Sequence, residues 1–185
     1  MKKSEKIAAW VLSGILVLLV GIWLSLKQGW WIPLPGVQVE VYFMRPGPVQ
    51  AQLVPVRRLA KGSKLEERLK TAIELVISGP SEEEKREGFY SAIPTETKLL
   101  DCRVDKEGMV FLDFSEDVEK GGGTQEMEER LAQIVFTATQ FSEIRCVQLL
   151  IDGKTVKYFS GEGITEVEHP LTRADFTQFN QGGSR

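Results

Sequence analysis

Six short stretches of this chain have apolar patterns that predict β-strands, and in the first of them apolar and polar side chains alternate, as is typical of a half-buried strand. In the first stretch, VQVEVYFMR, the valines and the phenylalanine would face the core, while Gln38, Glu40 and Tyr42 face the other side. Gly108 and the pair Asp152-Gly153 stand between strands, where tight hairpin turns need residues that tolerate a positive φ. The predicted strands are residues 37–45, 52–59, 97–104, 109–114, 144–151 and 155–159.

Two longer stretches repeat apolar residues at helical spacing. The first runs from Leu65 to Ile77. Ser63 precedes it and Glu66 lies in its first turn, at the spacing of a capping box, and Gly79-Pro80 ends it. The second begins at Thr124 and has one apolar face, made of Met127, Leu131, Ile134, Val135 and Ala138.

The resulting element order is β-β-α-β-β-α-β-β. Runs of hairpin-connected strands separated by single helices predict an α+β domain over residues 37–176, with two helices packed on one face of a mainly antiparallel sheet. The polar residues 177–185 are predicted to form a tail.

Residues 7–26 contain no charged side chain, and a helix of that length would cross the hydrocarbon core of a bilayer. Three lysines precede the segment, so residues 1–6 are predicted to stay in the cytoplasm and the rest of the chain to be extracytoplasmic. Residues 27–36 follow as a proline-containing linker. A cleaved signal peptide is the alternative, although the apolar run is longer than is usual for one.

Charge limits the classes of partner. Residues 1–27 carry a net charge of +3 and the whole chain −3, so the remaining part carries −6. An acidic domain lacks the basic surface that neutralises phosphates, which argues against binding to nucleic acid. Cys102 and Cys146 lie in apolar strands, either as buried thiols or as one disulfide of an exported protein. Two sulfurs without clustered histidines predict no zinc site, and we expect no cofactor.

Candidate catalytic groups are few. His169, the only histidine, precedes a proline and has no serine or cysteine nucleophile in a typical context. Asp113, Glu116 and Asp117 form a small acidic group, but their spacing matches no calcium loop and better suits a strand end whose side chains satisfy backbone amides. We therefore predict that the chain is not an enzyme and has no catalytic or metal site.

Several segments occur in an order that resembles the GerMN domain, the sporulation and spore germination domain of Gram-positive bacteria. The segments are VEVYF (39–43), LVPVRR (53–58), AIELVISGP (72–80), GFYSAIPTETKLL (88–100), MVFLDFS (109–115), LAQIVFTATQF (131–141), VQLLIDGK (147–154) and HPLTRADF (169–176). The resemblance implies an exported, non-enzymatic domain, similar in topology to ring-building motifs that assemble between the two membranes of a developing spore. One member of the family has a lipid anchor and paired domains, whereas this sequence has one such domain and no cysteine near its apolar segment.

These observations together predict a membrane-anchored scaffold or interaction protein of the cell envelope, acting in endospore formation or germination. Its partners would be envelope proteins or further copies of itself, joined through exposed sheet edges such as the strand that contains Pro55. The alternative is a module that binds peptidoglycan, with Tyr90, Tyr158 or Phe159 stacking on sugars.

Overall fold

The computed structural model describes residues 36–160 and 164–179, together with Gly14 and Leu16. The elements described below all belong to one compact unit that begins at Gly36. The predicted span 7–26, apart from those two residues, lies outside the described residues, as do the N-terminal segment 1–6 and most of the linker and tail. Searched over the described residues alone, the chain has no helix of the length and hydropathy that a membrane span requires.

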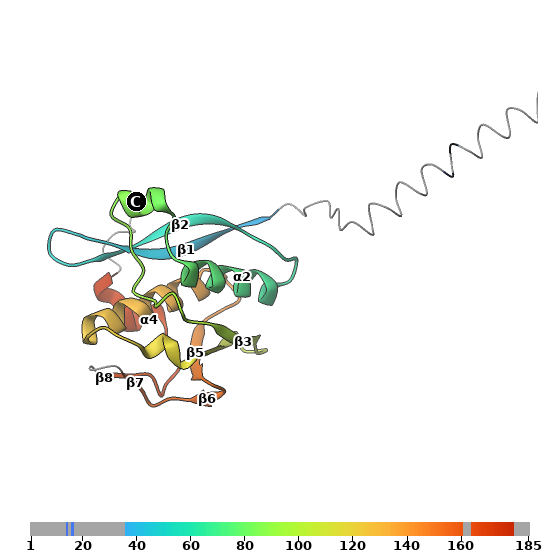
Figure 1. Ribbon diagram of the computed structural model, residues 1–185. Coiled ribbons are helices and arrows are strands. Elements are labelled where there is room, and N and C mark those ends of the chain that lie inside the picture. The colour runs from blue at the N-terminus through green and yellow to red at the C-terminus, as the bar shows by residue number, and fades with distance from the viewer. Residues whose placement is uncertain (1–13, 15, 17–35, 161–163, 180–185) are drawn as a thin grey trace, which may run out of the picture. The chain divides into compact units, whose positions relative to one another are not determined.

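Two helices lie between two layers of strands (Figure 1). On one side of the helices is a hairpin of two strands, and on the other is a four-stranded sheet. The hairpin consists of β1 (Val37–Arg45) and β2 (Gln52–Ala60), and the helices are α2 (Leu65–Ser78) and α4 (Thr124–Ala138). The sheet contains β3 (Leu99–Val104), β4 (Met109–Phe114), β5 (Cys146–Ile151) and β6 (Lys154–Thr155).

Shorter elements complete the domain. A second small hairpin joins β7 (Tyr158–Ser160) to β8 (Ile164–Glu166). The remaining elements are α3 (Glu82–Arg86) and the 3₁₀ segments η1 (Glu116–Glu119) and η2 (Arg173–Phe179).

The α+β class predicted from the sequence is confirmed, but the predicted single sheet is wrong. The four-stranded sheet has the order β3-β4-β5-β6, and the β1–β2 and β7–β8 hairpins are separate sheets. Within the larger sheet β4 and β5 are parallel, because α4 connects them as a crossover. The helices do lie against one face of this sheet, but their opposite side is covered by β1.

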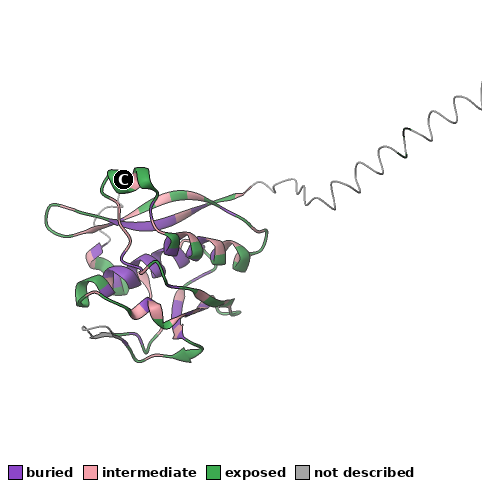
Figure 2. Cartoon of the chain, in the orientation of Figure 1, coloured by how far each residue is buried: buried purple, intermediate pink, exposed green. Residues whose placement is uncertain are grey.

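Helix α4 shows why a second layer is needed. The predicted apolar face is buried, and so are four polar residues outside it: Glu129, Arg130, Gln133 and Thr137. Figure 2 shows this helix buried along most of its length. The buried polar groups of such a helix must form hydrogen bonds within the protein, because water does not reach them.

The ends of α2 partly match the prediction. Gly79 ends the helix with a φ of 78°, as expected. The predicted pair of Ser63 and Glu66 is wrong by one position, since Glu67 accepts the backbone N–H of Ser63 at 2.9 Å and that of Lys64 at 3.4 Å. Glu66 is thereby free to accept the backbone N–H of Val104 at 3.1 Å, which ties α2 to β3.

The two predicted tight turns are confirmed. Gly108 has a φ of 82° in the β3–β4 turn, and a Cβ there would lie 2.5 Å from the carbonyl oxygen of Glu143. Asp152 and Gly153 have φ values of 47° and 74°, which form the β5–β6 turn.

The structure decides between the two alternatives for the cysteines. Both are free, half-buried thiols. Cys102 pairs with Leu112 on one side of β4 and Cys146 pairs with Met109 on the other. Two strand spacings place them about 10 Å apart or more, beyond the reach of a disulfide.

Candidate interaction surfaces

Side chains of α4 and of the turn after it close the outer edge of β1. Gln140 accepts the backbone N–H of Glu40 at 2.5 Å and donates to the carbonyl oxygen of the same residue at 2.5 Å, as a neighbouring strand would. Two residues along, Thr137 accepts the backbone N–H of Tyr42 at 3.1 Å, and Gln133 donates to the Tyr42 carbonyl oxygen at 3.0 Å. This edge of the hairpin therefore has no free backbone group at these two positions.

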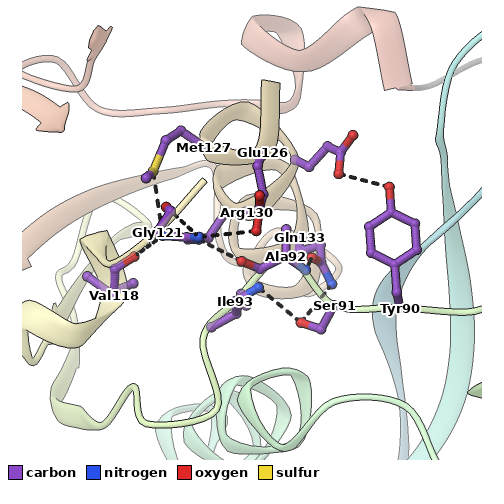
Figure 3. Close-up of polar contacts among 11 residues, drawn as sticks. Tyr90, Ser91, Ala92, Ile93, Val118, Gly121, Glu126, Met127, Arg130 and Gln133 are labelled. Carbon is purple, nitrogen blue, oxygen red and sulfur yellow. Dashed lines mark hydrogen bonds and ion pairs between the residues drawn. The ribbon is translucent and has the colours of Figure 1, made fainter. Parts of the chain in front are cut away.

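The outer edge of β1 is also closed at the next residue whose backbone groups point outward. Met44 exchanges two backbone hydrogen bonds with Tyr90, of 3.0 and 2.9 Å. The hydroxyl of Tyr90 in turn donates to the buried carboxylate of Glu129 at 2.9 Å. Burial is the main cause that raises the pKa of Tyr90, and this hydrogen bond is the second. Tyr90 is thus tied to the fold through both its backbone and its ring, as Figure 3 shows for the ring.

Arg130 forms the centre of a buried polar cluster (Figure 3). Its side chain is 1% exposed, and burial lowers the pKa of its guanidinium. The guanidinium donates to the carbonyl oxygens of Ala92 at 2.7 Å, Val118 at 2.6 Å and Gly121 at 3.4 Å. The cluster fixes the loop before β3 and the glycine-rich loop before α4 to one helix, which is a structural role.

The outer edge of β2 is interrupted. The backbone N–H and C=O groups of Glu40, Tyr42 and Met44 point away from β2. In an antiparallel pair the residues opposite them also direct their backbone groups outward, and in β2 these are residues 53, 55 and 57, followed by 59. Proline at position 55 has no N–H to offer there, and the Arg57 carbonyl oxygen accepts from the Arg58 guanidinium at 3.2 Å. The proline that suggested an edge strand therefore also blocks regular pairing along it.

The outer edge of β3 differs from the other two. β3 stands at the end of the sheet and pairs with β4 alone. The backbone N–H of Asp105 donates to the carbonyl oxygen of Met109 at 2.9 Å, so Asp105 directs its backbone groups toward β4. Because the direction alternates along a strand, the N–H and C=O groups of Val104 and Cys102 point outward. Glu66 accepts the Val104 N–H, but the two groups of Cys102 have no partner among the described residues. Leu100, in a bulge of the same edge, is 50% exposed.

The acidic residues noted in the sequence have structural partners. Asp113 accepts the backbone N–H of Gly153 at 2.9 Å and so supports the β5–β6 turn. Asp117 contacts Lys120 at 2.5 Å and Ser115 at 3.1 Å, and the hydrogen bond from Lys120 lowers the pKa of Asp117. Glu116 lies in η1 and lines a shallow cleft that also contains Lys154.

His169 and the three aromatic candidates are dispersed. His169 is 55% exposed, with its Nε2 atom 3.8 Å from a carboxylate oxygen of Asp175. Phe159 is fully buried, and the ring of Tyr90 is held as described above. Only Tyr158 presents an exposed ring, at 45%, with the Lys157 ammonium 5.4 Å from its centre. The structure therefore leaves one of these three rings accessible for stacking on a sugar.

The fold and its surfaces define a small α+β domain whose polar groups mainly hold its layers together. The family model described as "Germane: Sporulation and spore germination" matches residues 40–157, which is more than half of the chain. The chain therefore belongs to the family of GerMN-domain proteins, as its sequence resemblance indicated.

Known relatives agree with this assignment. The spore germination protein GerM of Bacillus subtilis (strain 168) is 31% identical over 150 residues, which cover 80% of this chain and 38% of GerM. The first GerMN domain of that protein has a solved structure with a TM-score of 0.61 and 26% identity, covering 75% of this chain and 99% of the domain. This chain thus spans little more than a third of the length of GerM.

Two further solved structures share the fold. The tandem GerMN domains of the same Bacillus subtilis protein match with a TM-score of 0.59 and 26% identity, covering 76% of this chain and 47% of the tandem. A putative lipoprotein from Clostridium perfringens matches with a TM-score of 0.54 and 21% identity, covering 76% of this chain and 90% of the lipoprotein. At that identity the second similarity concerns the fold alone.

Proposed function

We propose that this chain is a membrane-anchored, extracytoplasmic scaffold of the cell envelope that acts in endospore formation or germination. The observation that carries the proposal is its similarity to a sporulation and germination domain over residues 40–157. The chain contributes an apolar segment at residues 7–26 with lysines ahead of it, which supports a single span with the domain outside the cytoplasm.

A non-catalytic role fits the way in which the polar residues are used. Asp113 supports a turn, Glu129 accepts the Tyr90 hydroxyl, and Arg130 holds three backbone carbonyls. Each of these groups is engaged by the fold rather than presented to a ligand. Recognition through an outer surface is therefore the activity that this arrangement favours, with envelope proteins or other copies of the chain as partners.

The test of location uses the full-length chain with a reporter fused after residue 185. Alkaline phosphatase is active only when exported, and green fluorescent protein carried by the same export route fluoresces only in the cytoplasm. We expect phosphatase activity in the membrane fraction and no fluorescence. Fluorescence without phosphatase activity would refute the topology, and active phosphatase in a soluble fraction would indicate cleavage rather than anchoring.

The test of role is deletion of the gene in its host, with counts of heat-resistant and of germinating spores. We expect a defect in one of these counts, restored by the full-length chain. A variant without residues 7–26 should fail to restore it, since the domain would stay in the cytoplasm. Normal counts after deletion would remove the support for a sporulation role.

A further inference from the structure

The edge of β3 is the longest described strand edge that contains no proline and is closed by a side chain at one end only, where Glu66 accepts the Val104 N–H. The equivalent edge of β1 is closed by α4 and Tyr90, and that of β2 contains Pro55. The outward N–H and C=O groups of Cys102 lie at the centre of the β3 edge. An open edge of this kind is a template for pairing with another strand.

We propose that two copies of this chain pair through β3, antiparallel, about a two-fold axis at Cys102. This deepens the proposed scaffold role by naming the surface through which copies associate. In this register the N–H and C=O groups of Cys102 bond to the same groups of the second copy. Such a contact is isologous, because each copy offers the same surface.

The charges that flank Cys102 fit a second copy. Asp101 and Arg103 stand one position to either side, on the exposed face of the sheet, with side chains 54% and 62% exposed. In the two-fold register each Asp101 lies opposite Arg103 of the second copy, so both cross-strand pairs join opposite charges. A strand of unrelated sequence would need to supply the reverse pattern, whereas a second copy supplies it by symmetry.

The helix beside the edge would meet the same helix of the second copy. α2 packs against β3, and its residues Glu66, Lys70 and Glu74 lie close enough to the Cys102 thiol to influence its pKa. A two-fold axis at β3 brings this row of the two copies side by side. Opposite charges face one another where the two helices are staggered by one turn, and like charges face one another where Lys70 lies on the axis.

The contact is short, which sets its strength. The Val104 N–H is already accepted by Glu66, and the bulge between Leu99 and Asp101 interrupts the edge on its other side. A few paired residues bury less area than a stable dimer in dilute solution needs. Confinement to a membrane raises the effective concentration of copies, and we expect pairing to be observed there.

The test uses the full-length chain in liposomes, labelled with donor and acceptor dyes through a C-terminal peptide tag, and measures energy transfer at increasing surface density. We expect transfer in the wild type above that of random crowding, and its loss on dilution with unlabelled chain. Asp101→Arg and Arg103→Asp each place like charges opposite one another, and should weaken pairing roughly tenfold to a hundredfold.

The matched control is an equal mixture of the two variants. A heterodimer of Asp101→Arg with Arg103→Asp restores both opposite-charge pairs across the contact. Each variant still lacks its own internal ion pair of 2.9 Å, so recovery cannot arise from a repaired fold. Circular dichroism of each variant confirms that it is folded before it is mixed.

Cys102 supplies a second readout. In this register the two Cys102 Cα atoms lie about 5.5 Å apart, within the range of a disulfide. Copper-catalysed oxidation at alkaline pH, in which oxygen takes two electrons and two protons from the thiols, should link wild type and Cys146→Ser into dimers, but not Cys102→Ser.

Three outcomes would overturn the proposal: no transfer above crowding, equal transfer in wild type and single variants, or no recovery in the mixture. Equal transfer in all forms would mean that copies associate through another surface. None of these outcomes alters the location test, so failure of this inference is distinguishable from failure of the proposed function.

Discussion

Replacing Arg130 by alanine tests whether the buried cluster holds the layers together. The side chain is 1% exposed, and its two short hydrogen bonds are to the carbonyl oxygens of Ala92 and Val118. Each buried carbonyl oxygen left without a donor costs about 1–3 kcal/mol. The variant no longer has to bury a charged guanidinium, and the desolvation energy saved offsets part of this cost. We expect the free energy of unfolding to fall by about 2–4 kcal/mol, and the melting temperature by roughly 6–12 °C.

The assay is chemical denaturation of residues 36–185 followed by far-ultraviolet circular dichroism. Fluorescence of tryptophan is no use here, because all four tryptophans of the chain precede residue 36. Glu126→Gln is the matched control. It removes only a 3.7 Å contact to Arg130 from a half-exposed carboxylate, and should change the unfolding free energy by less than about 0.5 kcal/mol.

Arg130→Met separates hydrogen bonding from packing, since methionine fills much of the same volume without a donor. If the unpaired carbonyls cause the loss, the methionine variant should be nearly as unstable as the alanine variant. A methionine variant within about 1 kcal/mol of wild type would refute the reasoning, because cavity formation would then explain the alanine result.

Three further predictions concern single side chains. Gln140→Glu removes the donor to the Glu40 carbonyl oxygen and should lower the unfolding free energy by about 1–3 kcal/mol, whereas an unchanged value would mean that the β1 edge needs no seal. The hydrogen bond from Arg58 lowers the pKa of Glu84 below its ordinary 4.5 in the folded state, so its stabilisation is present above that pH and lost as pH falls through the folded pKa. Wild type and Glu84→Gln should therefore differ in stability at neutral pH and converge in acid, as denaturation at several pH values would reveal. Burial raises the pKa of Cys102 to about 12, so little of its thiol is ionised at pH 8. Iodoacetamide at this pH should therefore label Cys146 at least about tenfold faster than Cys102, as measured by mass spectrometry. Equal rates would contradict the burial of Cys102.

Local patterns in the sequence predicted most of the elements because these depend on neighbours along the chain. The alternation in VQVEVYFMR gave β1, and the helical spacing from Leu65 to Ile77 gave α2. The short helix α3 is absent from the predicted elements, although Ser81 and Glu84 have the spacing of a capping box and form one. The signal was present, but a helix of five residues has too few apolar positions to show periodicity.

The residues that close the edge of β1 also form a pattern in the sequence. Gln133, Thr137 and Gln140 recur at intervals of four and three, a polar stripe along the second half of α4 and the turn that follows it. Such a stripe ordinarily predicts a face in water. Here it meets the backbone of β1, because a second layer of strands covers that side of the helix.

By itself the sequence determined the α+β class, the turns at Gly108 and Asp152-Gly153 and the family, since these follow from short-range periodicity, backbone preference and ordered motifs. Only the tertiary structure decided that β4 and β5 run parallel, that β1 and β2 form a layer of their own, and that the edge of β3 stays open while that of β1 is closed. Those features depend on which residues far apart in the chain meet, and pairing between distant strands is set by the packing of α4 between two layers rather than by any local pattern.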